Sequence, residues 1–116
     1  MNIKVGTDIL NKERFLQSYK HGGQRFLEKI FTPEELRNNS TEQLASIFCL
    51  KEALVKAFHL SHSSWLEITT TRHVSGKVEC SFLSGKIAKN VVSLDTSISH
   101  EDNLIIAVAV AIVDNT

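Results

Sequence analysis

Three charged residues carry the chemistry that this sequence suggests first: Asp8 near the N-terminus, and Glu52 and Lys56 farther along the chain. Carboxylates are ligands for hard cations such as Mg²⁺, and a lysine ammonium can neutralise phosphate. Glu52 and Lys56 are four residues apart, so on a helix they can form an ordinary surface pair worth about 0.3 kcal/mol. Their spacing alone does not show whether Asp8 meets them.

Period-two alternation predicts the element that carries Asp8. Ile3, Val5 and Ile9 alternate with polar or small residues, as in a strand with one apolar face. Asp8 is therefore expected on the face opposite these three residues, near the end of the strand.

A long amphipathic helix, from Thr41 to about Leu60, is predicted to carry Glu52. Its apolar stripe has helical spacing and comprises Leu44, Ile47, Phe48, Leu54, Val55 and Phe58. At about 100° per residue, Lys51 falls near the middle of this stripe and Glu52 at its edge. A lysine there is expected to pack its aliphatic stem on the core and to extend its ammonium into water.

Two shorter helices are predicted before it. Residues 11–20 form the first, and Thr32, Pro33 and Glu35 start the second as N-cap, first helical residue and capping-box partner. Residues 10–30 contain five lysine or arginine side chains against two glutamates. This balance fits either a solvated helix face or a docking surface for an acidic partner.

The second half of the chain predicts strands joined by turns. The expected elements are strands at 65–71 and 77–83, a short helix at 84–92, and strands at 94–99 and 104–113. The first two strands form an antiparallel pair, and the last is a run of ten apolar residues typical of a fully buried strand. His100 is placed at the hairpin end before it. The outline is an α+β fold, in which an antiparallel-rich sheet packs against a long helix.

Bulk composition limits the function classes. The length indicates a single domain, residues 1–116, and the 13 basic and 13 acidic side chains cancel. This balance argues against binding nucleic acid or a membrane through the whole surface. The ten-residue apolar run is too short for a membrane-spanning helix, and the N-terminus lacks the apolar run of a signal peptide. Cys49 and Cys80 form no metal or disulfide motif, so we expect reduced core thiols in a cytoplasmic protein.

Five short segments together resemble a known family. They occur in the order and with the spacing of the holo-acyl-carrier-protein synthases, which are small single-domain 4′-phosphopantetheinyl transferases. The segments are residues 6–9 (GTDI), 13–15 (ERF), 31–36 (FTPEEL), 48–57 (FCLKEALVKA) and 97–100 (SISH). The resemblance spans nearly the whole chain.

The resemblance implies an enzyme that transfers 4′-phosphopantetheine from coenzyme A to a serine of an apo acyl carrier protein and releases 3′,5′-ADP. It also implies a homotrimer with active sites at the subunit interfaces. Asp8 and Glu52 would then hold Mg²⁺, which prefers a few carboxylates together with phosphate oxygens. The carrier protein could serve fatty acid biosynthesis, polyketide synthesis or another dedicated pathway.

The same motifs imply roles for the two lysines of the long helix. Lys56 is expected to act with Asp8 and Glu52 as a catalytic residue and to contact a phosphate of coenzyme A. Three roles fit Lys51: phosphate binding, proton transfer, or holding Glu52 and a neighbouring subunit in place.

Three further residues receive expected contacts from the resemblance. His100 is expected near a phosphate or the pantetheine arm of coenzyme A, and Ser99 belongs to the same binding motif. Arg14 is expected to meet the acidic helix of a carrier protein, as a partner contact rather than a catalytic one.

Four features depart from the family pattern. Residues 46–47 are Ser-Ile where members carry Gly-Arg, the loop 59–64 has no glycine, Asn11 replaces an acidic residue, and the segment 85–97 is short. The missing arginine would be a natural phosphate contact. The alternative hypothesis is therefore a non-catalytic or weakly active paralogue that binds a carrier protein. A metal-dependent nucleotide hydrolase is a more remote option.

Overall fold

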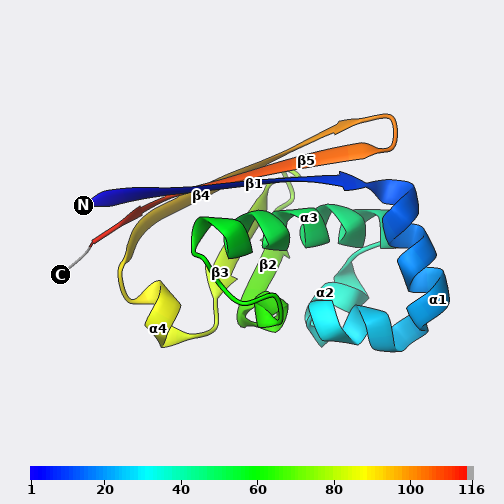
Figure 1. Cartoon of the computed structure of the whole chain (residues 1–116). Coiled ribbons are helices and arrows are strands. Elements are labelled where there is room, and N and C mark those ends of the chain that lie inside the picture. The colour runs from blue at the N-terminus through cyan, green and yellow to red at the C-terminus, as the bar shows by residue number, and fades with distance from the viewer. Residues whose placement is uncertain (115–116) are drawn as a thin grey trace.

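A three-stranded antiparallel sheet lies along one long helix at the centre of the molecule (Figure 1). The computed structural model describes residues 1–114. The strands are β1 (Asn2–Asn11), β4 (Val91–Glu101) and β5 (Leu104–Val113), in the order β1-β5-β4. The helix is α3 (Thr41–Ala57), and it packs on β1 and β5.

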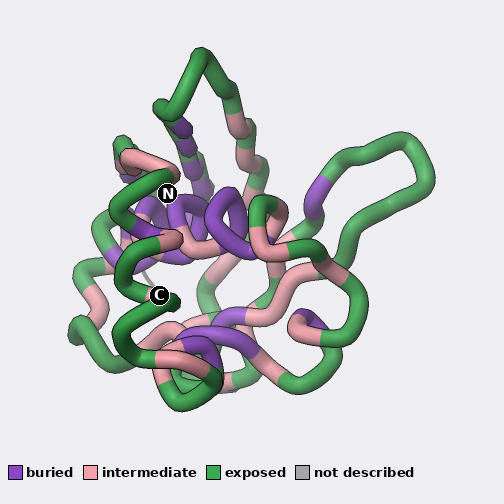
Figure 2. The backbone as a smooth tube through the Cα atoms, turned by 90° about the vertical axis from the view of Figure 1, so that its right-hand side faces the viewer, coloured by how far each residue is buried: buried purple, intermediate pink, exposed green. Residues whose placement is uncertain are grey.

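A two-stranded hairpin lies on the opposite side of α3 from this sheet (Figure 1). Its strands β2 (Ile68–Arg72) and β3 (Val78–Phe82) are antiparallel, as predicted. The first begins later than expected because a 3-10 helix, η1 (Ser64–Glu67), precedes it, and α4 (Gly85–Ala88) leads from β3 to β4. Buried residues gather along α3, between the sheet and the hairpin (Figure 2). The predicted α+β class is confirmed.

Helices α1 (Lys12–Ile30) and α2 (Pro33–Asn38) connect β1 to α3. The side chain of Asn11 caps α1 by accepting hydrogen bonds from two backbone N–H groups of its first turn, which gives this departure from the family pattern a local role. The helix continues past the predicted end at residue 20, with a break at Gly23, where φ is 61°. No helix within residues 1–114 has the length and apolar character needed to cross a membrane.

Only one face of the three-stranded sheet is covered. Along β5, buried residues that face α3 alternate with exposed ones. The exposed set is Leu104, Ile106, Val108, Val110 and Ile112, at 36–44%. The prediction that 104–113 is fully buried is therefore wrong for the single chain, because α3 packs on one face only. The apolar residues of β1, Ile3, Val5 and Ile9, lie on the same open face and are 62–73% exposed.

Gly6 sets how closely β1 approaches α3. A Cβ atom at this position would lie 2.0 Å from the carbonyl oxygen of Ala53 and 2.6 Å from the backbone nitrogen of Ala57. Neither backbone atom can move aside as the end of a flexible side chain could. Glycine at this position therefore lets Asp8, two residues farther along β1, lie beside the C-terminal half of α3.

Substitution of Gly6 by alanine should destabilise the fold. We expect Gly6→Ala to lower the free energy of unfolding by about 1–3 kcal/mol, because β1 must move away from α3 to relieve the overlap. Urea unfolding followed by circular dichroism measures this. Gly85→Ala is the matched control, since nothing lies within 4 Å of a Cβ at that position. Equal stability of the two variants would contradict the close approach.

Lys51 is completely buried, so the prediction that its ammonium reaches water is wrong. Its Nζ donates hydrogen bonds to Glu35 Oε1 at 2.7 Å, to the Ile30 carbonyl at 2.8 Å and to the Trp65 carbonyl at 3.2 Å. It also lies 5.4 Å from the centroid of the Phe31 ring. Burial lowers the pKa of Lys51, and the Glu35 carboxylate opposes that shift.

Glu35 is the partner that the sequence pattern did not assign to Lys51. Its Oε1 also accepts from the Thr32 backbone N–H at 2.8 Å, which completes the predicted capping box. Its Oε2 accepts from the Thr70 backbone N–H at 3.0 Å and from the Thr70 hydroxyl at 2.6 Å. A buried charge is tolerated when it is paired and hydrogen-bonded in this way. The ion pair therefore joins α2, α3 and β2 inside the core.

Removal of the negative charge of this pair should destabilise the protein strongly. We expect Glu35→Gln to cost about 3–5 kcal/mol, because the Lys51 ammonium would remain buried without its counter-charge. The control is Glu34→Gln, which removes a charge from the exposed neighbouring residue. The urea midpoints of the two variants measure this loss of stability. Similar midpoints would show that the pair does not stabilise the fold.

Candidate functional site

Asp8 lies on the face of β1 that packs against α3, opposite the exposed apolar residues, as predicted. It pairs with Ala107 of β5 in the sheet register. Its Oδ1 is 2.9 Å from Nζ of Lys56, which also donates a hydrogen bond to the Thr7 carbonyl at 3.2 Å. The Asp8 side chain is 15% exposed and that of Lys56 is 55% exposed. The pair therefore sits at the edge of the interface between β1 and α3, which we call the seam. A ligand can reach it there.

Glu52 lies one turn before Lys56 on α3, and its Oε1 accepts a hydrogen bond from Trp65 Nε1 at 3.1 Å. Of the ion pairs in the described chain, the one made by Lys56 is with Asp8 rather than with Glu52. The hydrogen bond to Asp8 raises the pKa of Lys56 against a weaker effect of burial, and the charges of both carboxylates add to the increase. The structure thus gathers one cation and two carboxylates at a single seam.

The oxygen atoms of this seam fit a hard divalent cation. Within residues 1–114, no group of three or more His, Cys, Asp or Glu side chains is placed to hold a metal. The protein ligands available to a cation at this seam are thus the two carboxylates of Asp8 and Glu52. Mg²⁺ is commonly held by one or two carboxylates and completes its coordination with water and substrate phosphate. The donor set thus suits an ion that is shared between the protein and a phosphate ligand.

Cys49 packs behind the seam. Its Sγ donates to the Asp8 carbonyl at 3.4 Å and to the Ile105 carbonyl at 3.6 Å. Burial, together with the nearby Asp8 carboxylate, raises the pKa of the Cys49 thiol to about 12, so this thiol is neutral and packs as a small apolar group. Both Cys49 and Cys80 are free, as predicted.

Lys51 points away from this seam into the core. Its ammonium has three protons, and three protein oxygen atoms accept them. These contacts hold segments of the same chain together, and the expected role of Lys51 in holding Glu52 and a neighbouring subunit in place stays a prediction. A direct contact between Lys51 and a phosphate is not supported, because the side chain has no exposed surface.

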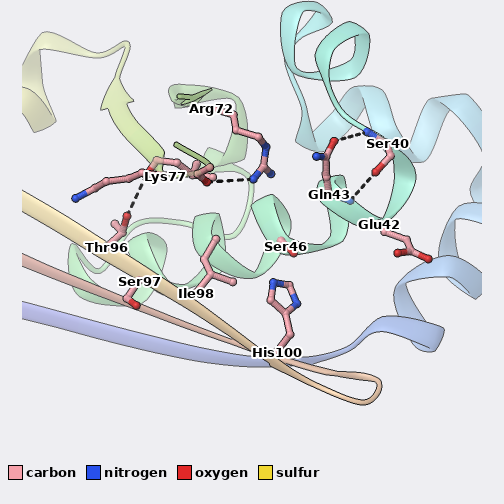
Figure 3. A pocket seen from close by; sticks show the side chains of 12 residues that line it. Ser40, Glu42, Gln43, Ser46, Arg72, Lys77, Thr96, Ser97, Ile98 and His100 are labelled. Atoms are coloured by element: carbon pink, nitrogen blue, oxygen red, sulfur yellow. Dashed lines mark hydrogen bonds between the residues drawn. The ribbon is translucent and has the colours of Figure 1, made fainter. Parts of the chain in front are cut away.

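A pocket of about 630 Å³ opens beside the first half of α3 (Figure 3). Glu42 and Ser46 line it from α3, Arg72 and Lys77 from the β2–β3 hairpin, and His100 from β4. Arg72 and His100 face this space against the Glu42 carboxylate, whereas the Lys77 ammonium is paired with Asp95 at 3.0 Å. The pocket is therefore suited to an anionic group.

The pocket and the carboxylate seam lie on different sides of α3. Asp8, Glu52 and Lys56 are not among the residues that line the pocket. Glu52 follows Ser46 by six residues, which is about 240° around a helix. His100 and Asp8 stand on the two outer strands of the sheet, with β5 between them. One chain therefore does not bring His100 to the two carboxylates.

Ser99 and His100 face opposite sides of β4, because successive side chains of a strand alternate. Ser99 pairs with Ile106, whose side chain is on the open face of the sheet, whereas His100 lines the pocket. A joint contact of both side chains with one ligand in that pocket is therefore not supported.

Arg14 is exposed in the first turn of α1. Lys20, Arg25 and Lys29, farther along this helix, are exposed as well. The positive charge expected from the sequence is thus displayed on the surface. Its use as a docking site for an acidic partner stays a prediction.

Two other departures from the family pattern have local explanations. Ile47 is 1% exposed and belongs to the core, so packing fills the position where the resemblance expects an arginine. In the loop after α3, His59 has a φ of 53°, a conformation that glycine adopts more easily. The loop therefore turns without glycine.

Trp65 and Glu35 have functions that sequence reasoning missed. The pattern places Trp65 in a strand and gives Glu35 only a capping role, whereas Trp65 hydrogen-bonds Glu52 and Glu35 neutralises Lys51. One signal was available for Trp65, since an indole N–H that is partly buried needs an acceptor. No signal in the spacing identified that acceptor.

Comparisons with known proteins agree with the fold. Residues 4–109 match the family model of the 4′-phosphopantetheinyl transferase superfamily. The holo-acyl-carrier-protein synthase of Dehalococcoides mccartyi is 34% identical over 116 residues, which cover 94% of this chain and 98% of that protein. The crystal structure of the synthase from Neisseria meningitidis has a TM-score of 0.81 at 30% identity and covers 93% of this chain and 96% of its own.

A second crystal structure, the holo-acyl-carrier-protein synthase of Helicobacter pylori in complex with coenzyme A, has a TM-score of 0.80 at 29% identity. The match covers 92% of this chain and 98% of that one. These matches extend over nearly the whole chain and include the segments that carry Asp8 and Glu52. The chain therefore belongs to the 4′-phosphopantetheinyl transferase superfamily, among the holo-acyl-carrier-protein synthases.

Proposed function

We propose that this chain transfers the 4′-phosphopantetheine group of coenzyme A to a serine of an apo acyl carrier protein in a Mg²⁺-dependent reaction. The serine oxygen forms a bond to the pantetheine-side phosphorus, the pyrophosphate bond breaks, 3′,5′-ADP leaves and the serine proton is released. The observation that carries the proposal is the meeting of Asp8, Glu52 and Lys56 at one seam. The family membership and the coenzyme A complex of a relative with the same fold support it.

Asp8 and Glu52 would hold Mg²⁺, which when bound offsets the negative charge of the pyrophosphate. Asp8 comes from a strand and Glu52 from a helix that packs directly on it, so both carboxylates are held by rigid elements. Lys56 remains protonated, because the hydrogen bond to Asp8 raises its pKa. Its partly exposed ammonium can turn to a phosphate oxygen and stabilise the charge that develops on the leaving group.

The open apolar face of the sheet supports a homotrimer. The exposed side chains Ile3, Val5, Ile9, Leu104, Ile106, Val108, Val110 and Ile112 share this face. Contiguous apolar surface of this kind usually marks an interface between proteins. Contact between copies through this face would bury it.

A second subunit would also complete the active site. In one chain, the pocket with His100 lies on a different side of α3 from Asp8 and Glu52. We therefore place His100 of one subunit near the coenzyme A that is bound at the carboxylates of another. Arg72 of the same pocket would add positive charge near the phosphates.

Arg14 and the basic surface of α1 would receive the carrier protein. Arg14, Lys20, Arg25 and Lys29 are all exposed on this helix. Their charge complements a partner with an acidic helix, and such complementarity mainly accelerates and orients the encounter.

Loss of either carboxylate should abolish most of the transfer. We expect Asp8→Ala and Glu52→Gln each to reduce the rate by about 10²–10³-fold, the usual effect of removing one group that stabilises developing charge. The measurement is the mass gain of an apo carrier protein incubated with coenzyme A and Mg²⁺. Glu67→Gln, at an exposed position that lies in η1, is the matched control, and chelation of the metal should also stop the reaction.

The same assay, together with a measurement of carrier binding, tests the second candidate function, carrier binding without catalysis. Ile47 favours it, because a buried isoleucine stands where the resemblance expects an arginine for phosphate. Tight binding of several apo carriers with no mass gain in any of them would reject the transferase and support the binding module.

Assembly should depend on the open sheet face. We expect the wild-type chain to have three times the 13.0 kDa mass of one subunit, and Val108→Asp to be a monomer, because a charge in a buried apolar interface is costly. Light scattering after size-exclusion chromatography measures both masses. Val74→Asp is the control, since Val74 is fully exposed on the β2–β3 turn. A wild-type monomer would reject the trimer.

A further inference from the structure

Trp65 is placed to control the orientation of Glu52. Its indole Nε1 donates a hydrogen bond to Glu52 Oε1 at 3.1 Å, and both side chains are partly buried. Oε2 of Glu52 receives no hydrogen bond from the described residues. The indole therefore occupies one carboxylate oxygen and leaves the other for a ligand.

The indole is itself held firmly. Its ring packs edge-on against Phe48, with 5.8 Å between the centroids, and Phe48 packs on Phe15 at 5.6 Å. Phe48 and Glu52 are four residues apart on α3, so they present adjacent positions to Trp65. One turn of the helix thus supplies both the aromatic contact and the hydrogen-bond acceptor.

The backbone of Trp65 is fixed by the buried ion pair. The Trp65 carbonyl accepts a hydrogen bond from Nζ of Lys51 at 3.2 Å, and the same Nζ is paired with Glu35. Glu35 also binds Thr70, two residues into β2. The short helix η1 is therefore tied to α3 immediately before Glu52 and to β2 through Glu35.

We propose that Trp65 is a positioning residue that holds the Glu52 carboxylate in the orientation needed to bind a divalent cation together with Asp8. An indole N–H donates and never accepts, and it does not titrate in the physiological range, so it offers the carboxylate one constant contact. Hydrogen bonds to carboxylates that bind metals orient them, and their loss commonly weakens binding by about 10–100-fold. The inference rests on the proposed function, because it takes Asp8 and Glu52 as the cation ligands.

Trp65→Phe tests the inference directly. Phenylalanine keeps an aromatic ring for Phe48 and the backbone carbonyl for Lys51, but it removes the N–H donor. The probe is Mn²⁺, and its free concentration is followed by electron paramagnetic resonance in the absence of coenzyme A and carrier. We expect Trp65→Phe to bind Mn²⁺ about 10–100-fold more weakly than the wild type while its urea midpoint changes little. Trp65→Phe with wild-type affinity would overturn the inference.

The fluorescence of the wild-type chain gives a second test that needs no substitution of Trp65. Trp65 is the single tryptophan in the 116 residues, so all indole emission comes from this position. We expect Mn²⁺ to quench this emission over the concentration range in which it binds, and Mg²⁺ in excess to reverse the quenching. Asp8→Ala and Glu52→Gln should remove the response. Binding without quenching would place the cation away from Trp65 and overturn the inference.

The outcomes separate the inference from the proposed function. If wild type and Trp65→Phe bind Mn²⁺ equally and both modify the carrier protein, the positioning role fails and the transferase stands. If the wild type neither binds Mn²⁺ nor modifies any carrier, both fail. Both stand if Trp65→Phe binds Mn²⁺ more weakly than the wild type and modifies the carrier more slowly than the wild type at limiting Mg²⁺ but not at saturating Mg²⁺.

Discussion

The buried ion pair between Lys51 and Glu35 is the interaction on which the rest of the structure depends. Such a pair is costly to remove from water and becomes tolerable only when every polar atom finds a partner. Here the ammonium has three acceptors and the carboxylate has four donors. Those partners come from the end of α1, from α2, from η1 and from β2. The pair therefore fixes where the small elements stand around α3, and with them the indole that meets Glu52.

A second constraint is the close approach of β1 to α3 at Gly6, which brings a strand carboxylate to a helix carboxylate. The same packing leaves α3 on one face of the sheet and exposes apolar residues on the other. It also separates the pocket with His100 from the seam with Asp8. These consequences of one helix lying on a narrow sheet are the physical basis for proposing that several copies share each active site.

Much of this arrangement could be predicted from the sequence. Alternation placed Asp8 on the correct face of β1, helical spacing placed Glu52 and Lys56 one turn apart, and the capping signals located α2. Alternation also separates Ser99 from His100, although the motif resemblance grouped them. The buried state of Lys51 could not be predicted, because its counter-charge lies 16 residues away in another helix. Trp65 could not be assigned to Glu52 for the same reason.

The sequence by itself determined most of the elements, the face of β1 that carries Asp8, and the family, since these depend on local periodicity, capping and short motifs. Only the tertiary structure decided which charged groups are neutralised in the core and which remain available to a ligand. Lys51 and Lys56 are alike in type and stand five residues apart in one helix. Lys51 is enclosed by the Glu35 carboxylate and two backbone carbonyls, and Lys56 meets Asp8 at the edge of a seam. That difference arises from long-range contacts, which no spacing along the chain encodes.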